Sequence, residues 1–208
     1  MKTHIYKGGR SLLFKNILEM WLEEKKEFVK ESTYAYYHFE IQNYIIPALG
    51  ETAADKITEK KIQNAVLMWQ NTGMQNGGPL KKSTVQNLVM LIKQVIRYAI
   101  RKCLMQDFSF QVFFASHKER QVFPIFSSEE QKHLIIALLN DLNYKTFGIL
   151  LSMNSGLRIG ELCALKWSDI DTDNQLIHVR KTLQRIYLKN EQPKTCILIA
   201  SPKTNSSI

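Results

Sequence analysis

The sequence predicts a mainly α protein with a small β-hairpin part near its C-terminal end. Apolar residues recur at helical spacing from about residue 11 to residue 104. After Asp171, two short apolar runs at 176–180 and 195–199 have strand composition instead. With 208 residues, 45% of them apolar, the chain can form one large domain or two small ones.

The first three helices follow from apolar stripes and their end signals. The first stripe runs from Leu13 to Leu22, with Ser11 as its candidate cap. Ser32 and Thr33 interrupt the pattern. A second helix then covers 34–46, and Pro47 and Gly50 are expected to end it. Thr58 is expected to cap a third helix, whose inward residues are Ile62, Val66 and Trp69.

A fourth helix is expected to open at Ser83, after a glycine-rich loop at 71–79. Its inward stripe is Val85, Leu88, Val89, Ile92, Val95, Ile96 and Ala99. Lys93, Arg97 and Arg101 recur every four residues and form a separate basic stripe. One helix therefore offers both a core face and an edge that can meet phosphates.

Residues 105–124 show no sustained helical period and are interpreted as a linker. Four phenylalanines in it are expected to pack on one of the two flanking domains, namely Phe108, Phe110, Phe113 and Phe114. Ser127 and Glu130 form a capping box that starts a helix through Leu139, and another helix is expected from Tyr144 to Met153. The stretch 189–193 suits a turn between the two strands.

The charge distribution points to a polyanionic partner. The net charge is +9, and residues 1–120 carry 18 Lys or Arg against 11 Asp or Glu. No acidic residue lies between Glu59 and Asp107, although eight basic residues do. Because folded surfaces normally mix both signs, this stretch favours a nucleic-acid face. An ordinary solvated basic surface is the alternative.

Several function classes are not expected. No apolar run reaches the ~18 residues that a membrane span requires, and no signal peptide is present, so a cytoplasmic protein without a membrane partner is expected. The three cysteines, Cys103, Cys163 and Cys196, have no metal-ligand spacing. We expect no metal site and no cofactor.

The stretch 154–171 carries the most information. It begins as a turn at Ser155-Gly156 and continues as a short helix, with Ile159, Leu162 and Leu165 expected on one face. We expect this helix to be buried, and an arginine at its head, Arg158, then requires an anion. Glu161, one turn away, is one candidate, and a phosphate brought by a partner is the other. An ordinary i,i+3 pair of Arg158 with Glu161 on the surface of the helix is the alternative. The residues alone leave both open.

This stretch resembles the first arginine box of the tyrosine recombinase (phage integrase) family. The match covers the turn, arginine, carboxylate, aromatic and aspartate positions, namely Gly156, Arg158, Glu161, Trp167 and Asp169. The segment 201–207 resembles the family's β-hairpin lysine motif. The four helices resemble its core-binding domain, through Leu49-Gly50, Ile57-Thr58 and the helix from Ser83.

The resemblance implies a domain order. It places an N-terminal tail at 1–10, a helical core-binding (SAM-like) domain at 11–104, a linker at 105–124 and an incomplete α+β catalytic domain at 125–208. It also implies double-stranded DNA as the partner, and a reaction that cleaves and rejoins strands through a 3′-phosphotyrosyl intermediate, without metal or cofactor.

The residue roles follow from the resemblance. Arg158 is expected to bind the scissile phosphate, Glu161 to orient that arginine, and Lys203 to protonate the 5′-hydroxyl leaving group. Lys194, also in a Pro-Lys-Thr context, is the rival for the last role. The residues expected to contact DNA are Lys81, Lys82, Ser83, Thr84, Ser32 and Thr33 near helix starts, together with Lys93, Arg97 and Arg101. For each Ser or Thr, an ordinary helix cap is the alternative.

One departure from the family is large. The His-x-x-Arg box and the nucleophilic tyrosine should follow the lysine hairpin, and neither follows Lys203 within residues 1–208. We therefore expect no complete cleavage and rejoining from this chain, and no synaptic tetramer of the kind full-length relatives form. Leu162, Leu165 and Ile177 are expected to lack part of their cover, which favours aggregation. A non-catalytic DNA-binding regulatory protein and a helical adaptor for an acidic protein remain as alternatives.

Overall fold

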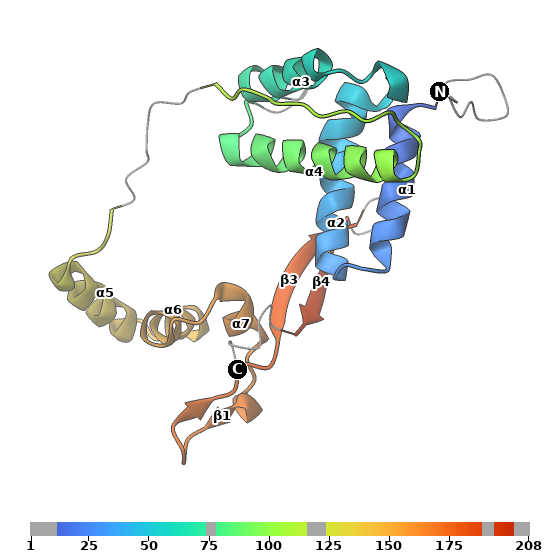
Figure 1. The fold of residues 1–208 in the computed structure, drawn as a ribbon. Helices are drawn as coiled ribbons and strands as arrows, with labels where there is room; N and C mark the ends of the chain where they lie inside the picture. The colour runs from blue at the N-terminus through green and yellow to red at the C-terminus, as the bar shows by residue number, and fades with distance from the viewer. Residues whose placement is uncertain (1–11, 74–77, 116–123, 189–193, 202–208) are drawn as a thin grey trace. The chain divides into compact units, whose positions relative to one another are not determined.

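The computed structural model describes residues 12–73, 78–115, 124–188 and 194–201. The chain divides into two compact units, Met1–Lys118 and Glu119–Ile208, which we call the helical unit and the arginine unit (Figure 1). Most described elements are helices, and the strands form two small antiparallel pairs. The predicted fold class, mainly α with a small β part, is confirmed.

The helical unit contains four α-helices with two irregular helical segments between them. Its elements are α1 (Phe14–Lys26), α2 (Glu31–Glu40), the π-helical η1 (Ile41–Gly50), the 3₁₀ turn η2 (Ala54–Lys56), α3 (Glu59–Asn71) and α4 (Lys82–Arg101). Thr58 caps α3 as predicted, because its Oγ1 accepts a hydrogen bond from the Lys61 amide at 3.4 Å. α4 begins one residue before the predicted Ser83. Ser11 lies outside the described residues.

The prediction that Pro47 stops the second helical stretch was wrong, although the stretch does end at Gly50, the other predicted stop. α2 starts at Glu31, so Ser32 and Thr33 lie in its first turn, and η1 then carries the chain through Pro47 to Gly50. In an α-helix the proline ring clashes with the carbonyl four residues earlier. A π-helix spaces its hydrogen bonds five residues apart, and this wider turn can hold the ring.

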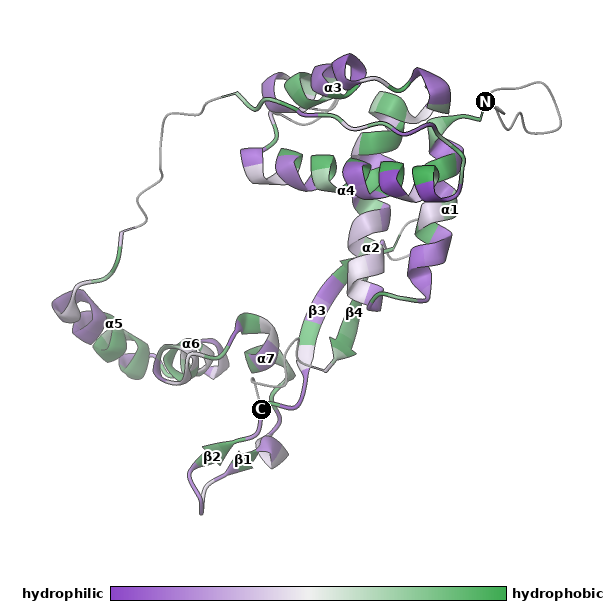
Figure 2. Ribbon diagram, viewed as in Figure 1, coloured by the Kyte–Doolittle hydropathy of each residue, from purple (hydrophilic) through white to green (hydrophobic). Residues whose placement is uncertain are grey.

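One hydrophobic core holds the helical unit together. All seven residues of the predicted inward stripe of α4 are buried, which confirms that prediction. Bands of hydrophobic and hydrophilic residues alternate along α4 in Figure 2 because only one side of the helix faces this core. Its largest fully buried side chains come from α1, η1, α3 and α4: Trp21, Trp69, Phe14, Ile17, Leu18, Ile41, Ile45, Ile62, Leu88, Leu91, Ile92 and Ile96.

The arginine unit places three helices before its strands. They are α5 (Ser128–Asn140), α6 (Tyr144–Ser155) and α7 (Ile159–Ala164), followed by the 3₁₀ turn η3 (Trp167–Asp169). The predicted capping box is confirmed: the Ser127 amide donates to Glu130 Oε2 at 2.7 Å, and the Glu130 amide donates to Ser127 Oγ at 3.2 Å. Asn143 caps α6 in a similar way, accepting from the Lys145 and Thr146 amides.

The strands pair differently from the prediction. β1 (Ile170–Asp171) pairs with β2 (Leu176–Ile177), and β3 (Thr182–Tyr187) pairs with β4 (Thr195–Ala200). The first strand of the long hairpin is therefore 182–187 and not 176–180. Thr182 to Tyr187 mixes polar and apolar residues without a strict alternation, so its strand signal in the sequence is weaker than that of the apolar run before it. The predicted turn at 189–193 lies outside the described residues.

Candidate functional site

A glycine turn presents Arg158 at the start of α7. α6 ends at Gly156, whose φ of +69° is the left-handed conformation that favours glycine. The carboxylate of Glu161 accepts from the Arg158 amide at 3.0 Å and from Arg158 Nη1 at 2.9 Å. These two hydrogen bonds, the backbone one first, lower the pKa of Glu161. Glu161 is thus a buried, charged acceptor that orients the arginine.

The Arg158 side chain itself is not buried. It is 73% exposed and pairs with Glu161, so the structure agrees with the alternative of an i,i+3 pair on the helix surface and not with a buried guanidinium. The helix is short enough that its head lies at the surface, where Ile159 is also 74% exposed. The Glu161 anion is in place, and the exposed face of the guanidinium can still reach a phosphate.

Gly160 allows α7 to pack closely on β3, because it has no side chain. A Cβ at this position would lie 2.6 Å from Thr182 Oγ1 and 2.9 Å from the Leu183 carbonyl oxygen. Only glycine allows the helix backbone to come this close to the strand. The arginine is therefore held at a fixed distance from the long hairpin.

Of the two candidate lysines, only Lys194 lies among the described residues. Lys203, the expected general acid, lies outside the described residues. Its rival Lys194 is exposed and immediately precedes β4, where its carbonyl accepts from the Leu188 amide at 2.8 Å. The choice between them stays a prediction.

The N-terminus of α4 gathers several predicted DNA contacts. Lys81 is the residue at the cap position, Lys82 and Ser83 are exposed in the first turn, and no acidic residue lies there. In a helix of 20 residues, this end combines free amides with two cations, an arrangement that suits a phosphate. Thr84, next in the turn, is half-buried.

The capping alternative for the four hydroxyl residues is wrong. Lys30 and Lys81 hold the cap positions of α2 and α4, and neither cap has a side-chain hydrogen bond. Ser32 and Thr33 lie in the first turn of α2, half-buried and next to the acidic Glu31. This acidic neighbour makes the start of α2 a weaker phosphate site than the start of α4.

The basic stripe of α4 is partly engaged within the helical unit. Lys93 lies over the Phe110 ring, with its Nζ 5.5 Å from the centroid. Arg101 pairs with Glu24 at 3.0 Å, and Lys102 pairs with the same carboxylate at 2.8 Å. The hydrogen bond from Lys102 is the first cause of the lowered pKa of Glu24. Arg97 is exposed and has no ion-pair partner within the described ranges.

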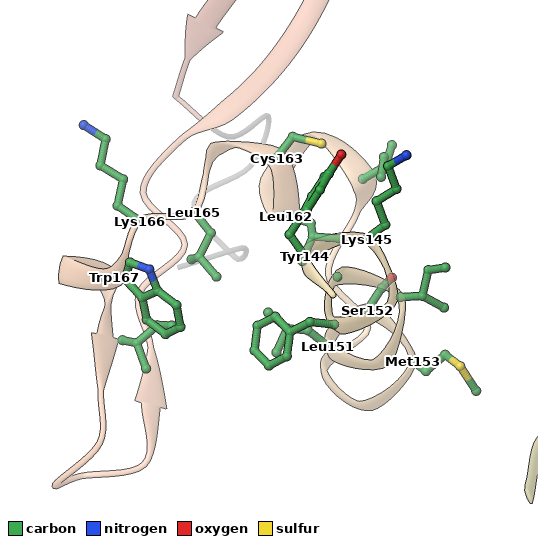
Figure 3. A pocket seen from close by; sticks show the side chains of 15 residues that line it. Tyr144, Lys145, Leu151, Ser152, Met153, Leu162, Cys163, Leu165, Lys166 and Trp167 are labelled. Atoms are coloured by element: carbon green, nitrogen blue, oxygen red, sulfur yellow. The ribbon is translucent and has the colours of Figure 1, made fainter. Parts of the chain in front are cut away.

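An apolar cavity of about 730 Å³ lies beside the arginine helix (Figure 3). Side chains of α6, of α7 and of the following turn line it, among them Tyr144, Leu151, Leu162, Leu165 and Trp167. The rings of Phe147 and Trp167 stack across it with centroids 6.5 Å apart. Arg158 does not line this cavity, so the cavity is not part of the site around the Arg158 guanidinium.

Neither a metal site nor a membrane-spanning helix is found among the residues that the structure places. Among them, no group of three or more His, Cys, Asp or Glu side chains could hold a metal ion. None of the helices placed in the structure is both long and apolar enough to cross a membrane.

A SAM-like helical unit followed by an arginine helix and an antiparallel hairpin defines the class of the DNA integrases. Two sequence models match the chain: "Phage integrase, N-terminal SAM-like domain" over residues 13–70 and "Phage integrase family" over residues 125–199. The chain belongs to the phage integrase (tyrosine recombinase) family. The two matches together cover most of the described residues of both units.

Individual relatives agree with this assignment. The ICEBs1 integrase of Bacillus subtilis (strain 168) is 23% identical over 207 residues, which are 96% of this chain and 51% of that protein. The Tn1549 transposon integrase in complex with a circular intermediate DNA has the same fold, with a TM-score of 0.72 and 21% identity over 94% of this chain and 59% of that one. A lambda integrase dimer bound to a COC' core site gives a TM-score of 0.58 and 16% identity over 92% of this chain and 49% of that one. The chain thus spans about half the length of the ICEBs1 integrase.

Proposed function

We propose that this chain binds double-stranded DNA as part of a site-specific recombinase. The observation that carries the proposal is the basic start of α4, where Lys81 and Lys82 flank free helix amides and no acidic residue competes. Family membership supports it, because the Tn1549 and lambda integrase structures are complexes with DNA. A cytoplasmic location goes with this proposal.

The proposed contact residues differ in how readily they can reach a DNA phosphate. Lys81, Lys82, Ser83, Thr84 and Arg97 are exposed or half-buried and can reach a phosphate backbone. Lys93 and Arg101 first have to leave the Phe110 ring and the Glu24 carboxylate. Ser32 and Thr33 act only if phosphate approaches past Glu31. We therefore assign the main contribution to the start of α4 and to Arg97.

Arg158 is the proposed ligand of the reacting phosphate. A fixed guanidinium binds two non-bridging oxygens and gains strength as negative charge builds on them. Glu161 holds this group in place, and Lys203 is the proposed proton donor to the leaving 5′-hydroxyl. The nucleophile would be a tyrosine that forms a 3′-phosphotyrosyl bond.

No tyrosine follows Lys203 within residues 1–208. We therefore expect a polypeptide of these residues alone to bind DNA without rejoining strands. A lambda integrase tetramer is known bound to a Holliday junction. We propose a synaptic assembly of this kind for a whole recombinase and not for residues 1–208.

The test measures affinity for a duplex of random sequence at several salt concentrations. We expect log K to fall steeply with log[salt], because phosphate contacts release counterions. Lys82→Glu and Arg97→Glu should each reduce this slope by about 1 and weaken binding to all sequences alike. Arg101→Glu is a poorer probe, because it also places two acidic side chains together at Glu24.

Lys26→Glu is the matched control, because it makes the same charge change at an exposed position at the end of α1. It should leave both slope and affinity near those of the unchanged protein. Equal losses in all three variants would assign binding to net charge alone. Absence of any salt-dependent affinity would favour the adaptor for an acidic protein.

A further inference from the structure

Residues 108–115 form an extended segment on the surface of the helical unit. The chain reverses after α4 at Cys103, where φ is +56°, and then runs back along the helices (Figure 1). Phe108, Phe110, Val112 and Phe114 pack against the hydrophobic core, while the residues between them face outward. This alternation is that of a β-strand with one buried face. Of the four phenylalanines predicted to pack, only Phe113 does not, because it is 75% exposed.

Side chains of α3 take the place of a partner strand. The amide of Gln111 donates to Glu59 Oε2 at 2.9 Å, and the amide of Ala115 donates to Gln70 Oε1 at 3.0 Å. Between them, Gln63 bonds both backbone groups of Phe113: its Oε1 accepts from the amide at 2.8 Å and its Nε2 donates to the carbonyl at 2.9 Å. Residues 111, 113 and 115 point the same way along an extended chain, and Glu59, Gln63 and Gln70 share one side of α3.

This attachment changes how far the two units can separate. From Ala115 to Ser127, at the start of α5, a fully extended chain spans at most about 40 Å. From Leu104, just after α4, to the same serine it spans about 80 Å. Release of residues 108–115 from the helical unit therefore doubles the greatest distance that the connecting chain can span between the two units.

We propose that residues 108–115 are a strap, and that Glu59, Gln63 and Gln70 are positioning residues which hold it on α3 and so limit the reach of the arginine unit. This proposal rests on the proposed function, in which both units contact one DNA molecule. A tether half as long raises the effective concentration of the second unit at the DNA by about threefold. The strap thus contributes to affinity without touching DNA.

The first experiment needs no DNA. Amide hydrogen exchange is measured by NMR on the whole chain, and the amides of Gln111, Phe113 and Ala115 should be protected. Gln63→Ala should raise exchange at Phe113 by about tenfold, since the amide loses its acceptor. Asn64→Ala, at the neighbouring exposed position of α3, is the control and should leave Phe113 unchanged. Equal exchange at Phe113 in both variants would show that Gln63 does not hold the strap.

The second experiment compares two duplexes of random sequence, one of about 30 bp and one of about 10 bp, a single helical turn. The double variant Glu59→Ala/Gln63→Ala should bind the longer duplex about threefold more weakly and the shorter one, which is bound by a single unit, unchanged. If exchange rises at Phe113 but affinity for the longer duplex does not fall, the inference is wrong and the proposed function stands. If the unchanged protein binds neither duplex, the proposed function is wrong, while the exchange data still report the attachment.

Where the double variant unfolds the helical unit, Gln63→Glu supplies the same test with less disturbance. It keeps an acceptor for the Phe113 amide but loses the donor to the Phe113 carbonyl. Exchange at Phe113 should then be faster, and affinity for the longer duplex lower, than in the unchanged protein. Values equal to those of the unchanged protein would overturn the role of Gln63.

Discussion

Glu40 is a carboxyl group that the helical unit buries at the junction between α2 and η1. It is 6% exposed, and its Oε2 has no hydrogen-bond partner in the part of the chain that the structure describes. Burial raises the pKa of this carboxyl to about 7, and a hydrogen bond with Tyr36 offsets part of the rise. The charge of Glu40 in turn adds to the raised pKa values of Tyr36 and Tyr44, whose first cause is burial.

The raised pKa predicts that the helical unit loses stability as the pH increases. Between about pH 4.5 and 7 the native state binds the proton of Glu40 more tightly than the unfolded chain does, so the free energy of unfolding falls through this window. Glu40→Gln keeps an acceptor for Tyr36 and removes the titration. At pH 8 it should therefore be more stable than the unchanged protein by about 1–3 kcal/mol.

Urea unfolding at pH 5 and pH 8 measures this effect, with the fluorescence of the buried Trp21 and Trp69 as the signal for the helical unit. Glu23→Gln, at an exposed position of α1, serves as the control and should keep the pH dependence of the unchanged protein. A free energy of unfolding that stays constant from pH 5 to pH 8 in the unchanged protein contradicts the prediction.

Among the elements, the packing of α7 on β3 depends on Gly160. In Gly160→Ala the new methyl group overlaps Thr182 Oγ1 and the Leu183 carbonyl, so the helix has to move away from the strand. We expect a loss of about 1–3 kcal/mol in the stability of the arginine unit. Gly148→Ala in α6 is the matched control, because its Cβ would meet only Leu162 Cδ2, at 3.7 Å. This control should gain about 0.5–1 kcal/mol from helix propensity.

Thermal unfolding followed by circular dichroism compares the two alanine variants. Amide exchange in β3 then identifies the site of the loss, since the strand should lose protection in Gly160→Ala only. Equal stability in the two variants would mean that α7 is not held against β3 at the distance seen in the structure.

The sequence predicted those elements whose signal is local. The stripe of α4, the cap at Thr58 and the capping box at Ser127 are set by spacing within a few residues, and all are confirmed. The π-helix through Pro47 and the pairing of β3 with β4 depend on packing between distant residues, which a single-sequence pattern does not report. The strap had a visible signal, the alternation of Phe108, Phe110, Val112 and Phe114. Its partners Glu59, Gln63 and Gln70 had no such signal in the sequence.

The candidate site was predictable to a similar degree. The neighbours Arg158 and Glu161 were expected to interact because they lie one helical turn apart, and the structure joins them. The sequence left open whether Arg158 is buried or exposed, because this depends on how short α7 is and on which side of it faces β3. The contact of Lys93 with the Phe110 ring also depends on packing between distant residues, so it could not be inferred from the spacing of the basic stripe.

Across the whole molecule, the two units differ in how much apolar surface they bury. The helical unit has a large core. Among the described residues of the arginine unit, by contrast, only Leu138 and Ile186 are buried hydrophobics, while Ile159 is exposed and Trp167 is 81% exposed. Leu162, Leu165 and Ile177, expected to lack cover, are half-buried. Because burial of apolar area is the main source of stability, the arginine unit should unfold first.

The exposed apolar side chains of the arginine unit also predict non-specific association of a polypeptide of residues 1–208. Ile159→Ser/Trp167→Ser removes two large side chains that line the cavity beside α7. It should lower both the binding of the dye ANS and the concentration-dependent rise in light scattering severalfold, because both require contiguous apolar surface. Phe28→Ser is the control, since Phe28 is similarly exposed but belongs to the helical unit. If both variants reduce association equally, the cause is total exposed apolar area and not the surface around α7.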